Sequence, residues 1–532
     1  MSDAPYVVAS VDLGATSSRI FLREQRPGGL VSPDFIYQAK RDTTRSEGPH
    51  GYVCEDIGPA TEELLGRVHD EVEPGVRKRV GVFSFSTHGA ANTVCLDERG
   101  KPVFGTVSYD HPLTDADAEA FYAACGNPSR LYVETGTPDF PNALNWAKLL
   151  FHQKKHHPRE WAGVRSVVPF NVYAGLKICA SGTNPASDHT QTRCHGYGES
   201  SDGSFSSVIR CTGIQGLFPP FKSSYEVLGR IDPDVAEKYG FGKDAVVVVG
   251  GHDSSLFVKL LDLLGFENGV GVSSGTWDVI MALRREFYLE PRLQEKGVLQ
   301  NAGVDGEQVR TALFRGGQMR DRYIQRYREQ GFGDIPNDVP FDSKVLHGVM
   351  AGNPAIEPAY MDGFGPYPND NKPRNIPECY RGKPAAFHHA LAMSLALQRA
   401  MACEIAAKTK LPDVMTMDEF RSTPRPSPIV VGGHLAENYR EGDRDTGRIT
   451  TSMATFRIAA RGDIYRFNFP EPTSLATHIM GVCGREGIKP DDIGSGRMGF
   501  DADRVTLARS CPALKGYAFR FEKALGLHPD LD

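Results

Sequence analysis

Several features that would assign this chain to a specialised class are missing from its 532 residues. It has no stretch of about 18 consecutive apolar residues, which argues against a membrane-spanning helix. Its first residues, "MSDAPYVVAS", lack the basic start and apolar core of a signal peptide. No run of five like charges occurs and the formal net charge is only −6, so neither nucleic acid nor a membrane is an expected partner. We expect a cytoplasmic protein.

Paired cysteines are also absent. The ten cysteines are scattered between Cys54 and Cys511 without a Cys-x-x-Cys pair, which indicates free, buried thiols rather than disulfides or a zinc site. Histidines gather in "FHQKKHHPREW" (151–161), but lysines are interleaved with them. We therefore interpret this stretch, and the pair His388–His389, as surface helix ends rather than metal sites.

The chain is too long for a single core, so at least two domains are expected. Residues 5–22 have the pattern of a strand, a tight turn and a second strand, and "GVGVSSGTWDVIMAL" near residue 270 repeats it about half a chain later. We place the domain boundary between them, near residue 258, giving domains 1–258 and 259–532. The tail from about residue 484 has no assigned role.

Between these hairpins the first half alternates strand and helix patterns, which predicts an α/β layer architecture. The predicted strands are "RVGVFSFST" and "SVVPFNVY", and the predicted helices lie around residues 59–71, 115–124 and 142–154. In the second half, residues 385–410 predict a long helix that is apolar around most of its circumference and therefore buried. Residues 352–385 and 420–428 are rich in proline and glycine and predict loops.

The turn "DLGATSSR", from Asp12 to Arg19, has the chemistry of a phosphate site. Glycine lets a phosphate approach the backbone, and hydroxyl groups can donate hydrogen bonds to it. The turn residues of these kinds are Gly14, Thr16, Ser17 and Ser18. Arg19 can pair with phosphate oxygens, and Asp12, at the end of a buried strand, can hold Mg²⁺ directly or through water. The alternative is an ordinary hairpin with a polar tip, and the spacing is neither that of a P-loop nor that of a dinucleotide fingerprint.

Two further turns could complete a nucleotide site. Ser274, Gly275 and Thr276 offer a second set of amide and hydroxyl donors, so that one polyphosphate could be bound by one turn from each half. Gly432 and Gly433 follow another apolar strand pattern and could lie close to a flat adenine ring, although alone they indicate only a strand-to-helix turn.

Asp253 follows the valine run 246–249 and the glycine pair of "GGHDSS". At a strand end, a carboxylate can accept the proton of a hydroxyl group that attacks a terminal phosphoryl group. It can equally cap a helix that begins at Ser254. The segment alone favours the cap, whereas its combination with the two hairpins favours a general base.

In this order, the motifs resemble those of the sugar kinases of the FGGY carbohydrate kinase family, in the actin–hexokinase superfamily. "VDLGATSSRIFL" and "SSGTWDVIM" are similar to its two phosphate motifs, and "GGHDSSLF" to the segment with its catalytic aspartate. "IVVGG" and residues 471–480 resemble the adenosine region, where the family usually has a third glycine and this chain has His434. "STHGAANTVCLDERGKPVFGTVSYDH" (86–111) is similar to the sugar-site hairpin.

This resemblance implies an α/β, two-domain actin-like ATPase (ribonuclease H-like) fold, with mixed sheets flanked by helices and a cleft between the domains. It also implies ATP and Mg²⁺ as cofactors, Asp253 as the general base that touches the sugar, and His88, Gly89 and Asp110 as further sugar-binding residues. The forms "DLGA", "GHD" and "SSGTW" most resemble the branch that acts on 6-deoxy ketoses, L-rhamnulose and L-fuculose. The predicted assembly is a homodimer.

Three functions remain open at this point. The first is ATP-dependent phosphorylation of a small ketose at a primary hydroxyl, with ribulose, xylulose or glycerol as other acceptors. The second is a nucleotide- or sugar-binding sensor of the same fold without catalysis. The third is an actin- or Hsp70-like ATPase. The retained pair Asp12 and Asp253 weighs against the sensor, and the sugar-type hairpin at 86–111 weighs against the ATPase.

Overall fold

A computed structural model of the chain divides it into two units, each described here by itself. The first comprises Met1–Gly265, Gln300–Val309 and Phe469–Asp501, and the second Phe266–Leu299, Arg310–Asn468 and Ala502–Asp532. The structure describes residues 4–194, 196–266, 268–283, 289–336, 339–358, 364–367, 374–407, 428–436, 450–467, 469, 471–505 and 514–524.

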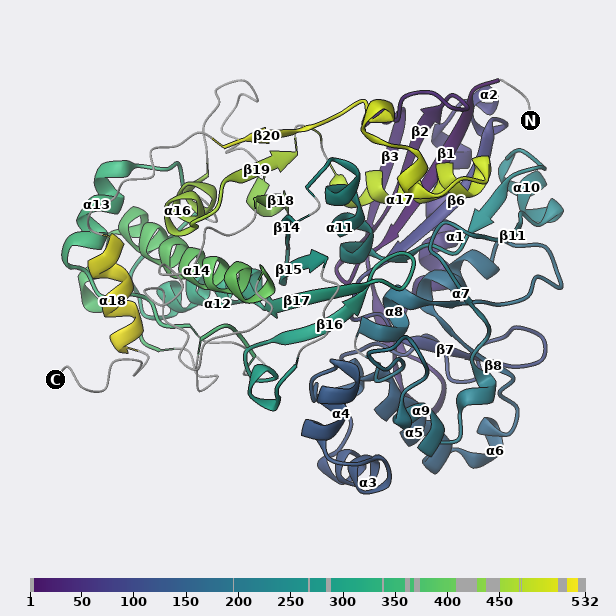
Figure 1. Cartoon of the computed structure of the whole chain (residues 1–532), viewed down its shortest axis with the longest axis horizontal. Coiled ribbons are helices and arrows are strands. Elements are labelled where there is room, and N and C mark those ends of the chain that lie inside the picture. Colours follow the sequence, from purple (N-terminus) through teal and green to yellow (C-terminus); the bar gives the residue numbers. More distant parts are fainter. Residues whose placement is uncertain are drawn as a thin grey trace. The chain divides into compact units, whose positions relative to one another are not determined.

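The first unit is built on a seven-stranded mixed sheet with the order β11-β12-β6-β1-β2-β3, and β13 also pairs with β6 (Figure 1). Strands β1, β6, β12 and β13 are parallel, and β2, β3 and β11 extend the sheet with antiparallel pairs. The strands are β1 (Tyr6–Leu13), β2 (Ser17–Gln25), β3 (Tyr37–Asp42), β6 (Val80–Thr87), β11 (Val227–Arg230), β12 (Val246–Val248) and β13 (Gly251–His252).

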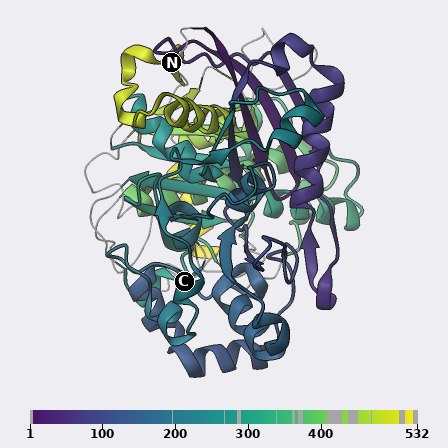
Figure 2. The same ribbon diagram turned by 90° about the vertical axis from the view of Figure 1, so that its right-hand side faces the viewer.

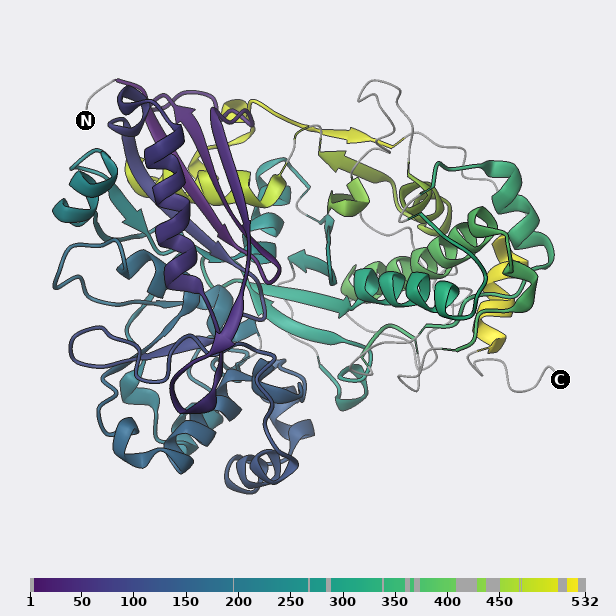
Figure 3. The same cartoon turned by 180° about the vertical axis from the view of Figure 1, so that it is seen from behind.

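Helices cover both faces of this sheet, and β1 is therefore buried along its whole length. Side chains alternate between the two faces of a strand. Val7, Ala9, Val11 and Leu13 pack in one cluster with α1 (Ile57–Glu71) and α7 (Phe170–Leu176), and Figure 3 shows α1 on that face. Tyr6 and Val8 pack instead toward α17 (Pro472–Glu486), through Val482.

Helix α17 lies very close to this second face. A Cβ atom at Gly481 would meet the Val8 side chain at 2.9 Å, so glycine permits the approach. The even-numbered residues of β1 that follow Val8 on this face are Ser10 and Asp12, so the face changes from apolar to polar toward the end of the strand. The local sequence therefore gives this face an apolar part that packs on α17 and a polar end at Asp12.

The rest of the first unit consists of short hairpins and helices. Its small sheets pair β4 (Arg45–Glu47) with β5 (Val53–Glu55), β7 (Thr93–Leu96) with β8 (Ser166–Pro169), and β9 (Ser187–Asp188) with β10 (Phe221–Lys222). Its other helices are α2 (Pro74–Arg77), α3 (Asp115–Cys125), α4 (Pro128–Thr135), α5 (Trp146–His156), α6 (Pro158–Trp161), α8 (His189–Cys194), α9 (Ser207–Cys211), α10 (Pro233–Tyr239) and α11 (Asp253–Leu263).

A second sheet has the order β16-β17-β15-β14-β18-β19-β20, in which β14, β18 and β19 are parallel. It belongs to the second unit except for the parts of β16 and β17 within 300–309, which are counted with the first. The strands are β14 (Val270–Ser274), β15 (Asp278–Leu283), β16 (Val298–Ala302), β17 (Gln308–Phe314), β18 (Ile429–Gly433), β19 (Ile464–Phe467) and β20 (Ala502–Arg504). The helices are α12 (Gly316–Glu329), α13 (Ser343–Gly352), α14 (Pro384–Ala407), α16 (Thr451–Ala459) and α18 (Leu514–Ala524).

Helix α14 is the central helix of the second unit. It packs on α13, α16 and β15, and it agrees with the predicted helix at 385–410. By length and composition it could cross a membrane, but 94% of its apolar window is buried inside the structure, as in the core helix of a folded domain. His388 and His389 lie in α14, but both are buried, so the expectation that this pair lies at the surface is wrong.

Most predicted elements are confirmed, with one correction. Both hairpins and the three helices of the first half form. The predicted strand "SVVPFNVY" is wrong in its second half, because the chain turns after Pro169 into α7, whose residues pack against β6. Residues 471–480, which the resemblance assigns to the adenosine region, form the beginning of α17 in the first unit.

The predicted boundary at residue 258 lies inside α11, and the first unit continues to Gly265. The predicted tail from residue 484 is divided between the two units. Part of the predicted loop at 352–385 and residues 420–427 lie outside the described residues. All nine cysteines of the described residues are free, and seven of them are buried.

Candidate active site

Three predicted site residues meet at the carboxyl edge of the first unit's sheet. In the parallel register Asp12 of β1 pairs with Ser86 of β6, and Ser86 pairs with Gly251 of β13. His88 and Asp253 each follow the last residue of their strand, at the same edge. Ligand sites of parallel α/β sheets lie at this edge.

Asp12 is buried beside Arg19, its partner across the hairpin. An Oδ atom of Asp12 lies 3.7 Å from the Arg19 guanidinium, and the Ser86 hydroxyl donates to Asp12 at 3.0 Å. Burial raises the pKa of Asp12 to about 6, with a smaller contribution from Asp253, while Arg19 opposes the shift. A buried carboxylate that is only partly neutralised suits a hard cation such as Mg²⁺, which prefers oxygen ligands.

Arg19 has a second partner that the sequence did not reveal. Glu471 accepts a hydrogen bond from the Arg19 guanidinium at 2.5 Å, although 452 residues separate the two. Glu471 has φ 54° and ψ 61°, a left-handed conformation that is uncommon outside glycine, and it immediately precedes α17. Asp12 and Glu471 together raise the pKa of Arg19, against the effect of its burial, so the guanidinium is charged.

Asp253 is the first residue of α11 and is oriented by its neighbours. Its Oδ1 lies 3.2 Å from Nε2 of the buried His252 and accepts hydrogen bonds from the backbone and the hydroxyl of Ser254. Burial alone would raise the pKa of Asp253, but the hydrogen bond and charge of His252 lower it. The alternative of a helix cap at Asp253 is not realised, since the capping position is His252.

His252 is held in a polar niche. Its Nδ1 lies 3.1 Å from the Ser255 hydroxyl and 3.8 Å from the Cys194 sulfur. Burial lowers its pKa, but Cys194 and Asp253 outweigh that effect and raise the pKa of His252 to about 10. These contacts favour the protonated form of His252, which in turn favours the ionised form of Asp253.

Gly89 lies against His252, not against an open surface. A Cβ atom at this position would meet His252 Nε2 at 2.4 Å. The absence of a side chain at residue 89 therefore allows the imidazole to occupy the position from which it contacts Asp253.

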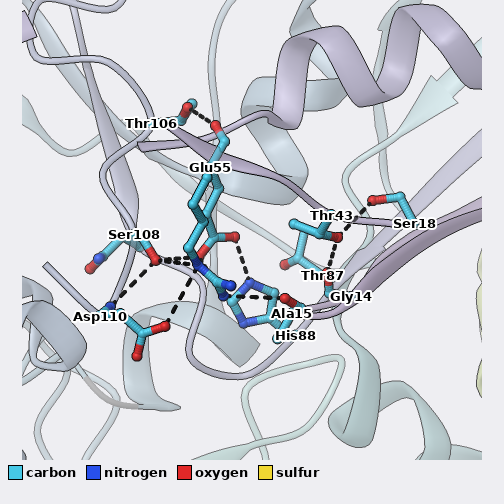
Figure 4. A network of polar contacts seen from close by, with 12 residues as sticks. Gly14, Ala15, Ser18, Thr43, Glu55, Thr87, His88, Thr106, Ser108 and Asp110 are labelled. Atoms are coloured by element: carbon cyan, nitrogen blue, oxygen red, sulfur yellow. Dashed lines mark hydrogen bonds and ion pairs between the residues drawn. The ribbon is translucent and has the colours of Figure 1, made fainter. Parts of the chain in front are cut away.

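A second group of polar residues surrounds His88 (Figure 4). His88 Nε2 lies 3.0 Å from Glu55 Oε2, and the Ser108 hydroxyl donates to Glu55 Oε1 at 2.8 Å. Arg45 lies 3.7 Å from Glu55 and 3.6 Å from Asp110. Glu55 is fully buried, which raises its pKa, but His88 and Arg45 reverse the effect and lower the pKa of Glu55.

The first hairpin turn is closed by its own backbone and by the segment that follows β3. The Gly14 amide donates to the Ser17 carbonyl at 3.1 Å, and the Thr43 hydroxyl donates to the Gly14 carbonyl at 2.8 Å. Ser17 is buried and Thr16 is exposed, so of these two residues only Thr16 has its hydroxyl at the surface. Figure 4 shows Ser18 directed toward Thr43. The hydroxyl oxygens of these two residues are 3.3 Å apart.

The remaining predicted residues lie together in the second unit. The parallel register places Ser273 beside Gly432 and Ser274 beside Gly433. Gly433 has φ +68°, and a Cβ atom there would meet the Ser274 carbonyl at 2.1 Å, so the two turns are in close contact. Thr276 is exposed at the tip of the β14–β15 hairpin.

Sequence reasoning missed Glu55, Arg45 and Glu471. Glu55 lies 33 residues from His88, and Glu471 lies 452 residues from Arg19. The segment 471–480 was noted for its resemblance to the adenosine region, which gave no sign of a contact between Glu471 and Arg19. A possible signal for Glu55 was a carboxylate within "YVCED", at the end of a short apolar stretch.

Comparison with known proteins gives the relatives of this chain. Residues 269–409 match the carbohydrate kinase FGGY C-terminal domain. The chain is 24% identical to the rhamnulokinase of Halalkalibacterium halodurans over 274 residues, which are 51% of this chain and 55% of that protein. It is 23% identical to the L-fuculokinase of Haemophilus influenzae over 295 residues, 53% of this chain and 58% of that protein. The chain thus matches somewhat more than half the length of these curated relatives.

Among solved structures, a carbohydrate kinase from Novosphingobium aromaticivorans superposes with a TM-score of 0.73 at 20% identity, covering 98% of this chain and 99% of that one. At this identity the likeness concerns the fold. The predicted α/β, two-domain actin-like fold with mixed sheets flanked by helices is confirmed.

Proposed function

Because this chain carries the C-terminal domain of the FGGY carbohydrate kinases, we propose that it transfers the terminal phosphoryl group of ATP to a primary hydroxyl of a small ketose. The observation that carries the proposal is the alignment of Asp12, His88 and Asp253 at one sheet edge. Such a kinase needs a metal-binding carboxylate, a base and sugar-binding groups within reach of each other.

Asp253 is the general base of the proposed reaction. The contacts from His252 and Ser254 all fall on its Oδ1, so we assign Oδ2 to the sugar hydroxyl. As the hydroxyl oxygen attacks the phosphoryl group, its proton passes to this oxygen. The protonated form of His252 favours the ionised carboxylate and fixes its orientation.

Asp12 is the proposed Mg²⁺ residue, directly or through water. The metal would supply positive charge that offsets the negative charge of the transferred phosphoryl group. Arg19, fixed by Glu471, is placed to meet a phosphate oxygen from the hairpin side. We assign the phosphates to Gly14, Thr16, Ser17 and Arg19 of the first turn and to Ser274, Gly275 and Thr276 of the second, with adenine beside Gly432 and Gly433.

His88, Gly89 and Asp110 belong to the proposed sugar site. Glu55 and Arg45 connect His88 with Asp110, so one rigid polar network would orient the ketose hydroxyls. We propose a 6-deoxy ketose of the L-fuculose or L-rhamnulose type, because the two curated relatives are named for these sugars. Ribulose, xylulose and glycerol are the alternative acceptors. We further propose a homodimer in the cytoplasm.

The test is release of ADP from ATP and Mg²⁺ with a panel of acceptors: L-fuculose, L-rhamnulose, L-ribulose, D-xylulose, D-ribulose and glycerol. The proposal predicts ADP release that depends on one of the 6-deoxy ketoses, with formation of its phosphate ester. Sugar binding without ADP release would contradict it in favour of a sensor, and ADP release indifferent to every sugar would contradict it in favour of an ATPase. Release with another acceptor would correct only the substrate.

A further inference from the structure

A second polar cluster lies in the first unit, where α3 packs against α5 (Figures 1 and 2). His152 and His156 are four residues apart on α5, so both project from one face of the helix. Asp117, in the first turn of α3, lies between them. Its Oδ1 is 3.3 Å from His152 Nδ1 and 2.8 Å from His156 Nε2. The packing of the two helices thus adds a carboxylate from outside the histidine-rich segment.

His156 makes a hydrogen bond of 2.8 Å to Asp117, whereas the distance between His152 and Asp117 suits two ligands of one metal ion better than a hydrogen bond. His152 Nδ1 is buried and makes no hydrogen bond among the described residues, although Asp117 Oδ1 is 3.3 Å away. Two ligand atoms bound at about 2.1 Å to a tetrahedral ion lie about 3.4 Å apart. The three ligand atoms lie within 4.8 Å of one another, so small rotations would bring all three onto one ion.

The carboxylate is already oriented by a second interaction. Asp117 Oδ2 accepts hydrogen bonds from the backbone and the hydroxyl of Thr114, in a capping box at the start of α3. Its Oδ1 is thereby turned toward the two imidazoles. Outer hydrogen bonds of this kind are typical of metal-binding carboxylates.

The three side chains are only partly buried, which gives an ion a path to them. The side chains of Asp117 and His152 are 11% and 17% exposed, whereas His156 is 43% exposed, so an ion can enter from the side of His156.

We propose that Asp117, His152 and His156 form a Zn²⁺ site, with a water molecule in the fourth position. Two imidazoles and one carboxylate favour zinc over magnesium, which prefers oxygen ligands alone. The bound ion would tie α3 to α5. This site is separate from Asp12 and does not depend on the proposed kinase activity.

Zinc binding to the full chain, freed of metal with a chelator and without nucleotide or Mg²⁺, tests the site. Competition with a chromophoric chelator should show that the wild type binds one zinc ion per chain with high affinity. His156→Gln should bind no zinc ion with that affinity. Co²⁺ should give the visible absorption of a tetrahedral complex in the wild type only. Thr114→Ala, which removes the outer hydrogen bond, should weaken binding about tenfold or more. His347→Gln, which replaces an exposed histidine of the second unit, is the matched control and should bind as the wild type does.

His156 is the most exposed of the three ligands, so its replacement should leave the fold intact, which far-UV circular dichroism would check. Asp117→Asn gives an independent test, because it removes the charged ligand on the other helix. Equal zinc stoichiometry and affinity in the wild type, His156→Gln and Asp117→Asn would overturn the proposal. The cluster would then be a histidine–carboxylate contact between two helices.

Discussion

In the β1–β2 hairpin the aspartate precedes the turn, whereas in the β14–β15 hairpin it follows the turn. The Asp12 carboxylate lies 3.7 Å from the Arg19 guanidinium, and it accepts a hydrogen bond from the Ser86 hydroxyl. Asp278 is fully buried and lies 3.0 Å from Arg399 of α14. A Cβ atom at Gly316 would meet Asp278 Oδ2 at 1.8 Å, so the chain packs closely around this second carboxylate.

The difference shows that similar turn sequences can place a carboxylate beside an arginine at the edge of a sheet, or against an arginine in the core of a unit. Asp12 has an arginine partner that also binds Glu471, and burial keeps its pKa high. Asp278 instead fixes the core helix α14 to the second sheet. We therefore expect changes near Asp12 to affect turnover, and changes near Asp278 to affect the stability of the second unit.

The largest effect is expected from Asp253→Asn. Loss of the general base should lower kcat by a factor of about 10³–10⁴, because an amide cannot accept the proton. Nucleotide affinity should not change. Steady-state ADP release and calorimetric titration with ATP would measure both. Asp244→Asn, at a side chain 92% exposed on the same unit, is the control and should keep full activity. Near-normal kcat in Asp253→Asn would exclude its role as the base.

The next largest effect is a loss of stability in the second unit. Arg399→Leu leaves Asp278 buried without its ion-pair partner, which should lower the free energy of unfolding by about 3–5 kcal/mol. Urea denaturation followed by fluorescence would measure it. Arg320→Leu removes an exposed arginine of α12 and should change stability little. Equal stability of the two variants would show that the Asp278–Arg399 pair is not structural.

Asp12→Asn should instead raise the free energy of unfolding of the metal-free protein. The pKa of Asp12 is raised to about 6, which means that the folded state disfavours the ionised carboxylate. The native aspartate therefore lowers the free energy of unfolding as pH rises. The gain from asparagine should be full above pH about 6, on the order of 2–3 kcal/mol, and absent below pH about 4. Thermal unfolding in the presence of a chelator at pH 4 and pH 8 would measure it. A variant less stable than the wild type at pH 8 would contradict this account.

Gly89→Ala should have a smaller effect that is specific to catalysis. Its Cβ atom would displace the His252 imidazole and, with it, the Asp253 carboxylate. A shift of about 1 Å in a reacting group can lower kcat by up to about 100-fold. Gly66→Ala, whose Cβ atom meets nothing within 4 Å on α1, is the control. Steady-state kinetics on both variants would separate them, and unchanged kcat in Gly89→Ala would remove His252 from the mechanism.

Sequence patterns predicted the elements better than the contacts between them. The β1–β2 hairpin and α14 followed from local alternation and from helix propensity, which depend on neighbouring residues. The turn of the chain at Pro169 depends instead on the packing of α7 against β6. The pairs Glu55–His88, Arg19–Glu471 and Asp117–His152 form only after distant segments meet, so no periodicity reveals them. The register that aligns Asp12 with Ser86 and Gly251 is likewise a property of the sheet.

The division of roles between the two hairpins is tested most directly by turnover of Asp12→Asn and Asp278→Asn, compared at a temperature where both remain folded. With saturating ATP, Mg²⁺ and the preferred ketose, we predict that Asp12→Asn is folded but nearly inactive. Asp278→Asn should unfold more easily and yet keep the kcat of the wild type per folded molecule. Full activity in Asp12→Asn, or loss of kcat in folded Asp278→Asn, would contradict the assignment of chemistry to the first hairpin and of structure to the second.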